Sequence, residues 1–446
     1  MDLNPVRGSR DFLVEEKLLR DWAMLRLKSV FERFGFNPLE TPAIENWEVL
    51  SSKYAGGAEI LKETYKLTDQ GNRELGLRYD QTVPTCRVLA ANPRLAMPFK
   101  RYSIAPVWRD GPIKLGRYRE FYQCDIDIFG VQSQAAEAEI VAVLKDGFEA
   151  LGIACKLKIN NRKVLDGLLE SCGVTAEQAA PVILSLDKLE KIGAKEVQKE
   201  MEQKGVSAAS ARKVLALFEE LDKLGNDKLL ARLEKILKSG AGAEGLAELS
   251  QLVGYVKLYG IDDDFYEVKA SLARGLSYYS STVFEGYEPN GIIKSSICGG
   301  GRFDDMVGKF SGKEKVPATG VSFGFESICE ILKDKVSKGE KVEGVRKTSV
   351  EVFVIPIKDQ PFAFEAAQEL RRQGINVAID LLGRAISKNL DYCSKQGIPF
   401  AAIIGDKEAK EKKINLRNLV SGEEKLVSVK DAAKTAREKP QASQEE

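Results

Sequence analysis

The 446-residue sequence contains no histidine, and this absence excludes several classes of enzyme. Histidine is the usual general base near neutral pH, the usual activator of a catalytic serine or cysteine, and the commonest ligand of transition metals. Triad hydrolases and zinc enzymes with histidine ligands are therefore excluded. The chemistry that remains depends on arginines, carboxylates, hydroxyl groups and the placement of reacting groups, with a hard metal ion on oxygen ligands as a further option.

Other patterns are also missing. No apolar run approaches the roughly 18 residues that a membrane-spanning helix needs, and the first residues do not resemble a signal peptide. The seven cysteines form no C-x-x-C pair, as expected of scattered thiols in a reducing compartment. No P-loop motif (GxxxxGKS or GxxxxGKT) occurs. We therefore expect a cytoplasmic protein that has no membrane partner.

The composition provides enough apolar material for folded cores. Hydrophobic residues make up 43% of the chain, and 67 basic residues balance 66 acidic ones, for a net charge of +1. At a loose prior of about 150 residues per domain, the length indicates two or three domains. A nucleic-acid partner would have to be bound by a local basic surface, because the whole molecule is almost neutral.

The spacing of apolar residues predicts the order of elements. It predicts helices at 12–34, 58–68, 81–91 and 135–151, and strands at 99–108, 119–129, 154–159, 265–270, 280–287 and 292–297. Residues 162–258 are rich in Lys, Glu, Leu and Ala at helical spacing, which predicts a helical insert. Residues 333–348 are charged and have no hydrophobic face, which is typical of a linker.

The last hundred residues follow a different rhythm. Predicted strands at 350–357, 375–381 and 399–404 alternate with predicted helices at 363–372 and 385–395. This alternation indicates a small α/β domain with a mainly parallel sheet. The stretch from Lys434 onward is polar, and we expect it to be frayed.

The densest polar stretch runs from Trp108 to Gln123 and contains four basic residues around a polar turn. These are Arg109, Lys114, Arg117 and Arg119. The planar fork of arginine matches the geometry of carboxylates and phosphates, so this hairpin suits a polyanionic ligand. A solvated hairpin with alternating charges explains the spacing equally well.

Three further features carry candidate chemistry. Asp125 and Asp127 share one face of a predicted strand. If this face is buried, the two carboxylates need a charged or hydrogen-bonding partner; otherwise the face is exposed to solvent, which the spacing slightly favours. Arg274 lies in apolar surroundings and meets either an anionic ligand or a structural carboxylate. The glycine triplet 299–301 permits close approach of a ligand to the backbone, yet a bulge is an equal alternative.

Taken together, these motifs resemble the histidyl-tRNA synthetases, which are class II aminoacyl-tRNA synthetases. The resemblance is carried by PVRGSRDF near the start, LRYDQTVP (77–84), WRDGPIKLGRYREFYQCDIDIFG (108–130), ARGLSYYSSTVFE (273–285) and AAIIGD near residue 405. It extends over nearly the whole chain and to the order of its segments. It implies an α+β class II catalytic domain, in which helices flank an antiparallel sheet, with a helical insert and a C-terminal α/β anticodon-binding domain.

The resemblance divides the chain into five parts. They are a catalytic core at 1–161 and 259–332, a helical insertion domain at 162–258, a charged linker at 333–348, an anticodon-binding domain at 349–433 and a polar tail at 434–446. The implied function is the ATP-dependent ligation of L-histidine to tRNA(His) through a histidyl-adenylate. The implied ligands and partners are ATP, Mg²⁺, L-histidine, tRNA(His) and a second copy of the chain in a homodimer.

The resemblance also implies roles for individual residues. Arg109 matches the arginine that holds the ATP α-phosphate and the amino-acid carboxylate, and Arg117 matches a residue that binds the outer phosphates. Arg274 matches the catalytic arginine that approaches the α-phosphate from the opposite side. The residues that match the grip on the α-amino group are Asp80, Thr82 and Gln123. The residues that match the imidazole-reading set are Asp127, Tyr278 and Tyr279.

Two positions depart from the family pattern. The third class II motif ends in Glu-Arg, whereas this chain has Glu326 followed by Ser327. Loss of a cation–π contact and of a charged hydrogen bond together amounts to about 2–5 kcal/mol. Ser277 stands where the family has an aspartate. These departures leave an alternative open, a synthetase-like paralogue that regulates a partner enzyme or binds tRNA without charging it.

Overall fold

The structure is a computed structural model that describes residues 1, 3–52, 58–186, 188–273, 279–312, 315–358 and 360–438. The chain forms two compact units, residues 1–11 with 23–342, and residues 12–22 with 343–446. The helix α1 (Val14–Arg33) contributes residues to both units. Within the described ranges, no helix is long and apolar enough to cross a membrane.

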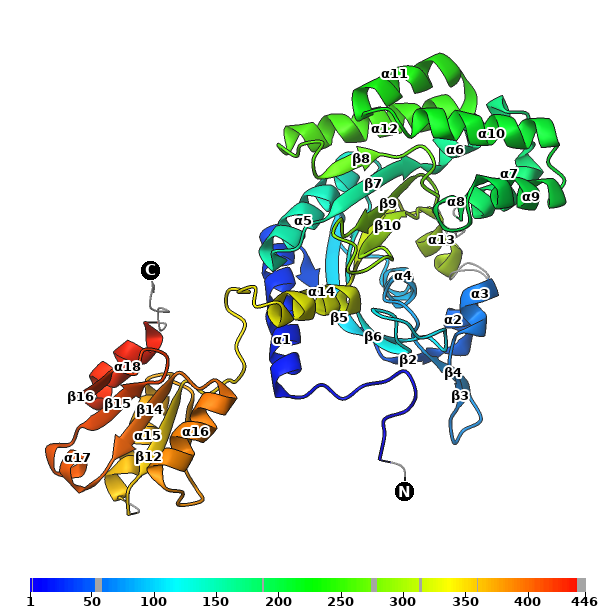
Figure 1. Cartoon of the computed structure of the whole chain (residues 1–446). Coiled ribbons are helices and arrows are strands. Elements are labelled where there is room, and N and C mark those ends of the chain that lie inside the picture. Colours follow the sequence, from blue (N-terminus) through cyan, green and yellow to red (C-terminus); the bar gives the residue numbers. More distant parts are fainter. Residues whose placement is uncertain are drawn as a thin grey trace. The chain divides into compact units, whose positions relative to one another are not determined.

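An eight-stranded sheet forms the centre of the first unit (Figure 1). In spatial order its strands are β1 (Asn37–Pro38), β5 (Phe99–Trp108), β6 (Glu120–Phe129), β11 (Ala318–Gly324), β10 (Cys298–Arg302), β9 (Thr282–Tyr287), β7 (Lys156–Asn161) and β8 (Tyr266–Val268). Neighbours are antiparallel except at the two edges, where β1 pairs with β5 and β7 with β8 in parallel. The antiparallel sheet expected for the catalytic domain is confirmed.

The two faces of this sheet differ because alternate residues of a strand point in opposite directions. On β11, Phe323 packs against Phe148 of helix α5 (Ala135–Leu151), with ring centroids 5.3 Å apart. Its neighbour Ser322 lines a cavity, as does Gly320 two residues earlier. Helix α14 (Phe325–Ser337) follows β11 directly and packs against β6 and β11.

Smaller elements border the cavity side of the sheet. A three-stranded sheet orders β2 (Ile44–Asn46), β4 (Glu74–Leu77) and β3 (Lys66–Thr68). The short helices are α2 (Trp47–Ser51), α3 (Ala58–Lys62), α4 (Thr82–Ala91) and α13 (Asp305–Ser311). Helices α4 and α13 pack on each other through a buried apolar cluster that includes Val83, Phe129 and Met306.

Among the described residues between β7 and β8, seven helices follow one another. They are α6 (Arg162–Ser171), α7 (Ala176–Leu186), α8 (Leu189–Ile192), α9 (Ala194–Gln203), α10 (Ala208–Leu221), α11 (Asn226–Ile236) and α12 (Gly240–Leu258). A G-x-G-x-x-G pattern at residues 240–245 lies inside α12 rather than after a strand, so it forms no dinucleotide-binding turn. Instead it allows close helix packing, because a Cβ on Gly245 would lie 2.6 Å from Cβ of Lys163 on α6.

The second unit contains a five-stranded sheet of mixed direction. Its elements are β12 (Val352–Pro356), α15 (Pro361–Arg372), β13 (Val377–Ile379), α16 (Ile386–Gln396), β14 (Phe400–Ile404), α17 (Asp406–Glu411), β15 (Ile414–Asn418), β16 (Glu424–Val427) and α18 (Val429–Arg437). Strand β12 pairs in parallel with β13 and β14, whereas β14, β15 and β16 pair in antiparallel fashion. The prediction of a mainly parallel sheet is confirmed for β13, β12 and β14 only. The antiparallel pairing of β15 and β16 is a finding of the structure, and the pattern does not predict β16 because this strand is polar and largely exposed.

Several predicted boundaries are wrong. Residues 66–68 form strand β3 instead of extending a helix, and the strand predicted at 292–297 is absent, since β10 begins at Cys298. Residues 333–337 belong to α14 rather than to a linker, and an Asp334–Lys338 ion pair of 2.6 Å spans the last helical turn. Residues 434–437 likewise belong to α18, whose buried alanines pack into the core of the second unit.

Candidate active site

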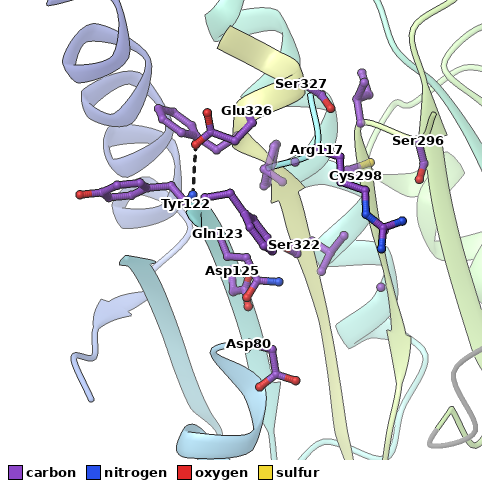
Figure 2. Close-up of a pocket in the computed structure, with 18 of the residues that line it drawn as sticks. Asp80, Arg117, Tyr122, Gln123, Asp125, Ser296, Cys298, Ser322, Glu326 and Ser327 are labelled. Atoms are coloured by element: carbon purple, nitrogen blue, oxygen red, sulfur yellow. Dashed lines mark hydrogen bonds between the residues drawn. The ribbon is translucent and has the colours of Figure 1, made fainter. Parts of the chain in front are cut away.

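A cavity of about 370 Å³ lies on one face of the large sheet (Figure 2). Its walls come from the segment before α4, the loop between β5 and β6, strands β6, β10 and β11, and the start of α14. Seven of the nine residues to which the resemblance assigns a role line it: Asp80, Thr82, Arg109, Arg117, Gln123, Asp127 and Tyr279. Arg274 and Tyr278, together with Ser277, lie outside the described residues.

Strand β6 supplies the floor of the cavity. Gln123, Asp125 and Asp127 occupy alternate positions, so their side chains share one face. Only 3% of Asp125 and 2% of Asp127 is exposed, which contradicts the exposed face that the spacing favoured. Burial raises the pKa of the Asp125 carboxyl, and it raises the pKa of Asp127 to about 7, although the Arg101 guanidinium acts in the opposite direction on both.

A third acid enters from the segment before α4. The Oδ1 atom of Asp80 accepts a hydrogen bond of 3.0 Å from the backbone N–H of Val83, so this carboxylate satisfies a free amide at the start of the helix. Burial raises the pKa of Asp80 to about 6. Because Thr82 is the first residue of α4, the helix start brings its hydroxyl to the same cavity.

Basic side chains enter from the loop between β5 and β6. Arg109 donates from Nε to the carbonyl oxygen of Tyr79 over 2.9 Å, and its guanidinium lies 5.3 Å from the centroid of the Phe121 ring. The loop is closed by two backbone hydrogen bonds of 3.0 and 2.8 Å between Lys114 and Arg117. Together these residues give the cavity a cationic wall opposite its acidic floor, as an ammonium- and phosphate-bearing ligand set requires.

The start of α14 closes one end of the cavity, where Figure 2 shows Glu326 and Ser327. Glu326 accepts a 3.1 Å hydrogen bond from the backbone N–H of Tyr122 and a 2.6 Å hydrogen bond from Arg10. Ser327 is 4% exposed, and a Cβ on Gly116 would lie 2.7 Å from its hydroxyl oxygen. Gly116 adopts φ +72°, a left-handed conformation that glycine accepts readily, so the loop turns directly against Ser327.

Sequence reasoning missed three residues that shape the site. Arg101 on β5 is fully buried and forms an ion pair with Asp127, its direct partner in the β5–β6 register. An arginine on a mostly apolar strand, opposite an acid across a hairpin, was the available signal. Gly320 gave no local signal, because its role depends on the pairing of β11 with β6. Arg10 belongs to the quoted PVRGSRDF segment, but its partners lie more than three hundred residues away.

The glycine triplet is part of the sheet. Gly299, Gly300 and Gly301 lie in β10 between β9 and β11. A Cβ on Gly300 would lie 2.0 Å from the carbonyl oxygen of Gly320. The triplet therefore allows close approach of neighbouring strands beside the cavity, which Gly299 and Gly300 also line.

Comparison with known proteins agrees with this geometry. Residues 8–328 match the family model described as "Histidyl-tRNA synthetase", and residues 351–439 match the "Anticodon binding domain". The chain belongs to the histidyl-tRNA synthetase family. This membership is consistent with a catalytic-type sheet in the first unit and with a separate, smaller sheet in the second.

Relatives of this family match over nearly their whole length. A protein named histidine–tRNA ligase 1 from Bacillus cereus is 41% identical over 436 residues, 97% of each chain. A histidine–tRNA ligase from Aeropyrum pernix is 38% identical over 437 residues, 96% of this chain and 97% of the relative. The crystal structure of histidyl-tRNA synthetase from Nostoc superimposes with a TM-score of 0.85 at 31% identity, covering 99% of this chain and 100% of that one.

Proposed function

We propose that the protein ligates L-histidine to tRNA(His) in an ATP-dependent reaction through a histidyl-adenylate. The observation that carries this proposal is one cavity in which a buried acidic floor, Asp80, Asp125 and Asp127, faces the cations Arg109 and Arg117. The full-length similarity to histidine–tRNA ligases supports it, and no observation favours a paralogue that lacks charging activity.

In the first step, a carboxylate oxygen of histidine attacks the α-phosphorus of ATP, and the bond to the pyrophosphate oxygen breaks. Arg109 neutralises charge on the α-phosphate and the attacking carboxylate, and Arg117 binds the outer phosphates. The resemblance assigns the approach to the α-phosphate from the opposite side to Arg274, which lies outside the described residues. The attacking carboxylate is already ionised at neutral pH, so orientation and charge neutralisation suffice, and a chain without histidine can perform this step.

The amino acid is recognised through its two other polar groups. Asp80, Thr82 and Gln123 bind the α-amino group. This agrees with the buried carboxylate of Asp80 and with the side-chain carbonyl oxygen of Gln123, for which no hydrogen-bond partner exists in the described part of the chain. Asp127 accepts a hydrogen bond from an imidazole N–H. Tyr278 and Tyr279 complete the set of residues that reads the imidazole. A site that depends on paired hydrogen bonds rejects analogues lacking them by roughly 10⁴-fold or more.

In the second step, the terminal adenosine hydroxyl of tRNA(His) attacks the activated carbonyl, and AMP leaves. Residues 162–258 form an insertion domain and residues 349–433 an anticodon-binding domain that contact the tRNA. We propose a cytoplasmic homodimer, as the resemblance to the family implies. Light scattering of the purified protein should give twice the mass of the 49.2 kDa chain.

Mg²⁺ is proposed only as the ion that accompanies ATP. Among the described residues, no group of three cysteine, aspartate or glutamate side chains is placed to hold a metal ion. Glu326, the acid of the third motif, is already held by Arg10 and by a backbone amide. A Mg²⁺ ion would therefore be bound mainly by phosphate oxygens and water, as this ion prefers.

Aminoacylation tests the complete reaction. Purified protein, ATP, Mg²⁺ and tRNA(His) should attach labelled histidine to the tRNA, and should not attach any other amino acid of a panel. Arg109→Ala should abolish product formation and serves as the inactive control. Labelled tRNA with an amino acid other than histidine, or no product from a folded protein, would overturn the proposed function.

A further inference from the structure

Asp127 is held from two sides within the sheet. Its carboxylate forms an ion pair with the guanidinium of Arg101 on β5, its direct cross-strand partner. On the other side its cross-strand partner on β11 is Gly320, and a Cβ there would lie 1.8 Å from Oδ1 of Asp127. The carboxylate therefore lies against the backbone of β11, where no side chain is present, and Arg101 binds it from β5. Of this ion pair, Asp127 lines the cavity and Arg101 does not.

Structural stability alone does not explain this arrangement. Arg101 is 0% exposed, and in the described chain its Nε and Nη1 atoms have no hydrogen-bond partner. Its Nη2 atom also donates to the carbonyl oxygen of Gln81 over a long 3.4 Å. Burying a charged group with unfilled donors is unfavourable, so the placement of Arg101 calls for an explanation beyond packing.

The charged groups around Asp127 point to an electrostatic role for Arg101. The groups that face Asp127 are Arg101 on β5, Asp125 on β6, Asp80 before α4 and the Cys86 thiol in α4, whereas β11 contributes the uncharged Gly320. Two acids and one base thus act on a carboxylate that is already desolvated. Without Arg101, every remaining influence on Asp127 favours its protonated, neutral form.

We propose that Arg101 is a positioning residue for amino-acid selection, which stabilises the ionised form of the Asp127 carboxylate and aims it so that it can accept an N–H from an imidazole. The inference rests on the proposed function, because it assumes that Asp127 reads the histidine side chain. Arg101 itself does not touch the substrate. Its effect is exerted on the charge and orientation of Asp127, and through these on the affinity for histidine.

The test is equilibrium binding of L-histidine by calorimetry as a function of pH, on Arg101→Gln and Arg101→Lys variants of the full chain. In the wild type, histidine affinity should fall below a certain pH, the pH midpoint. Removing the positive charge should raise this midpoint by about 1–3 units, the usual effect of an opposite charge at close range. At neutral pH, the Kd for histidine should rise about tenfold or more in Arg101→Gln. Arg101→Lys retains the charge and should keep the wild-type pH midpoint.

Two comparisons make the result decisive. The imidazole of the ligand also titrates, but it does so equally for all variants. The result is therefore the difference in pH midpoint between each variant and the wild type. Arg302→Met serves as the matched control, since it breaks another buried arginine–carboxylate pair, with Glu137, and should lower stability without moving the pH midpoint. Kinetics add a third criterion, because the KM for ATP should change less than about twofold in Arg101→Gln.

The outcomes separate the two proposals. If the wild-type protein does not bind histidine, the proposed function fails. If it binds histidine and Arg101→Gln, folded, shows an unchanged pH midpoint and Kd, the role of Arg101 is overturned while the proposed function stands. If Arg101→Gln does not fold, the single variant Asp127→Asn is compared with the double variant Asp127→Asn/Arg101→Met. Because asparagine carries no charge to stabilise, the double variant should bind histidine as tightly as the single one. A further tenfold loss of affinity in the double variant would overturn the proposed role of Arg101.

Discussion

At the scale of single residues, Ser327 shows that the departure from the third motif is matched by its surroundings. The serine is almost fully buried, and the left-handed turn at Gly116 lies directly against its hydroxyl. A longer side chain at this position, such as the arginine that the resemblance implies, would press against this turn at the edge of the cavity. The loop between β5 and β6, which carries Arg117, is therefore built around a serine.

Restoring the family's arginine should accordingly weaken the use of ATP. We expect Ser327→Arg to raise the KM for ATP about tenfold to a hundredfold, because displacing the Gly116 turn misplaces Arg117. The ATP dependence of pyrophosphate exchange measures this effect. Ser327→Ala is the control and should change the KM by less than about twofold, since it removes only a hydroxyl group. A lower KM in Ser327→Arg would contradict this account of the loop.

Gly320 provides a second test at this scale. A methyl group at this position meets Oδ1 of Asp127 at 1.8 Å, so the carboxylate has to move away from the place where it accepts an imidazole N–H. We expect Gly320→Ala to raise the KM for histidine about tenfold or more, with a much smaller change in the KM for ATP. Gly254→Ala in α12, where a Cβ meets open space, is the matched control. Equal effects of both substitutions on histidine would show that Gly320 has no special role.

Much of the candidate site could be predicted from the sequence, because the motif residues lie within short segments. Gln123 and Asp127 share a face by strand alternation alone, and Asp80 and Thr82 are two residues apart. The ion pair of Asp127 with Arg101 could not be predicted from local pattern, because it depends on the exact register of β5 and β6. The contact of Ser327 with Gly116 joins residues more than two hundred positions apart, which no spacing rule reaches.

At the scale of elements, a buried ion pair fixes α5 on the sheet. Arg302 on β10 donates from Nη2 to Oε2 of Glu137 on α5 over 2.7 Å, with 3% and 0% of these side chains exposed. The same guanidinium donates to the carbonyl oxygen of Val131 over 3.0 Å and to Asp304 over 3.2 Å. Breaking such a pair by removing one partner leaves an uncompensated buried charge.

We therefore expect Glu137→Ala to lower the free energy of unfolding by about 3–5 kcal/mol. Urea denaturation followed by circular dichroism measures the change. Glu219→Ala removes an exposed i,i+4 partner of Lys223 on α10 and should leave the unfolding free energy almost unchanged. A loss of similar size in the two variants would show that burial does not decide the strength of these pairs.

Long, strongly patterned elements could be predicted and short ones could not. The helix at 135–151 matches α5 at both ends, because its apolar stripe is uninterrupted. Strand β10 escaped prediction because glycine disfavours strands, and tertiary pairing with β9 and β11 overrides that preference. The end of α14 was assigned to a linker because its last turn is exposed and charged, so that no apolar pattern marks it.

At the scale of the whole molecule, we hypothesise that the absence of histidine protects the synthesis of this protein during histidine starvation. A chain without histidine codons can be translated when charged tRNA(His) is scarce, which avoids a loop in which starvation blocks its own remedy. We expect its synthesis in histidine-limited cells to continue at close to the rate in replete cells. Pulse labelling compares it with a variant carrying several surface histidines, in place of lysines such as Lys223. If synthesis of both proteins falls equally steeply, the absence of histidine reflects compositional drift.

The central claim is that this cavity activates histidine, and histidine-dependent ATP–pyrophosphate exchange tests it most directly. The purified protein should exchange label between pyrophosphate and ATP with histidine alone, and not with any other amino acid or without one. Arg109→Ala should remove the exchange. No exchange by a folded wild-type protein would contradict the account and would indicate that Ser277 and Ser327 mark a site that no longer forms an adenylate.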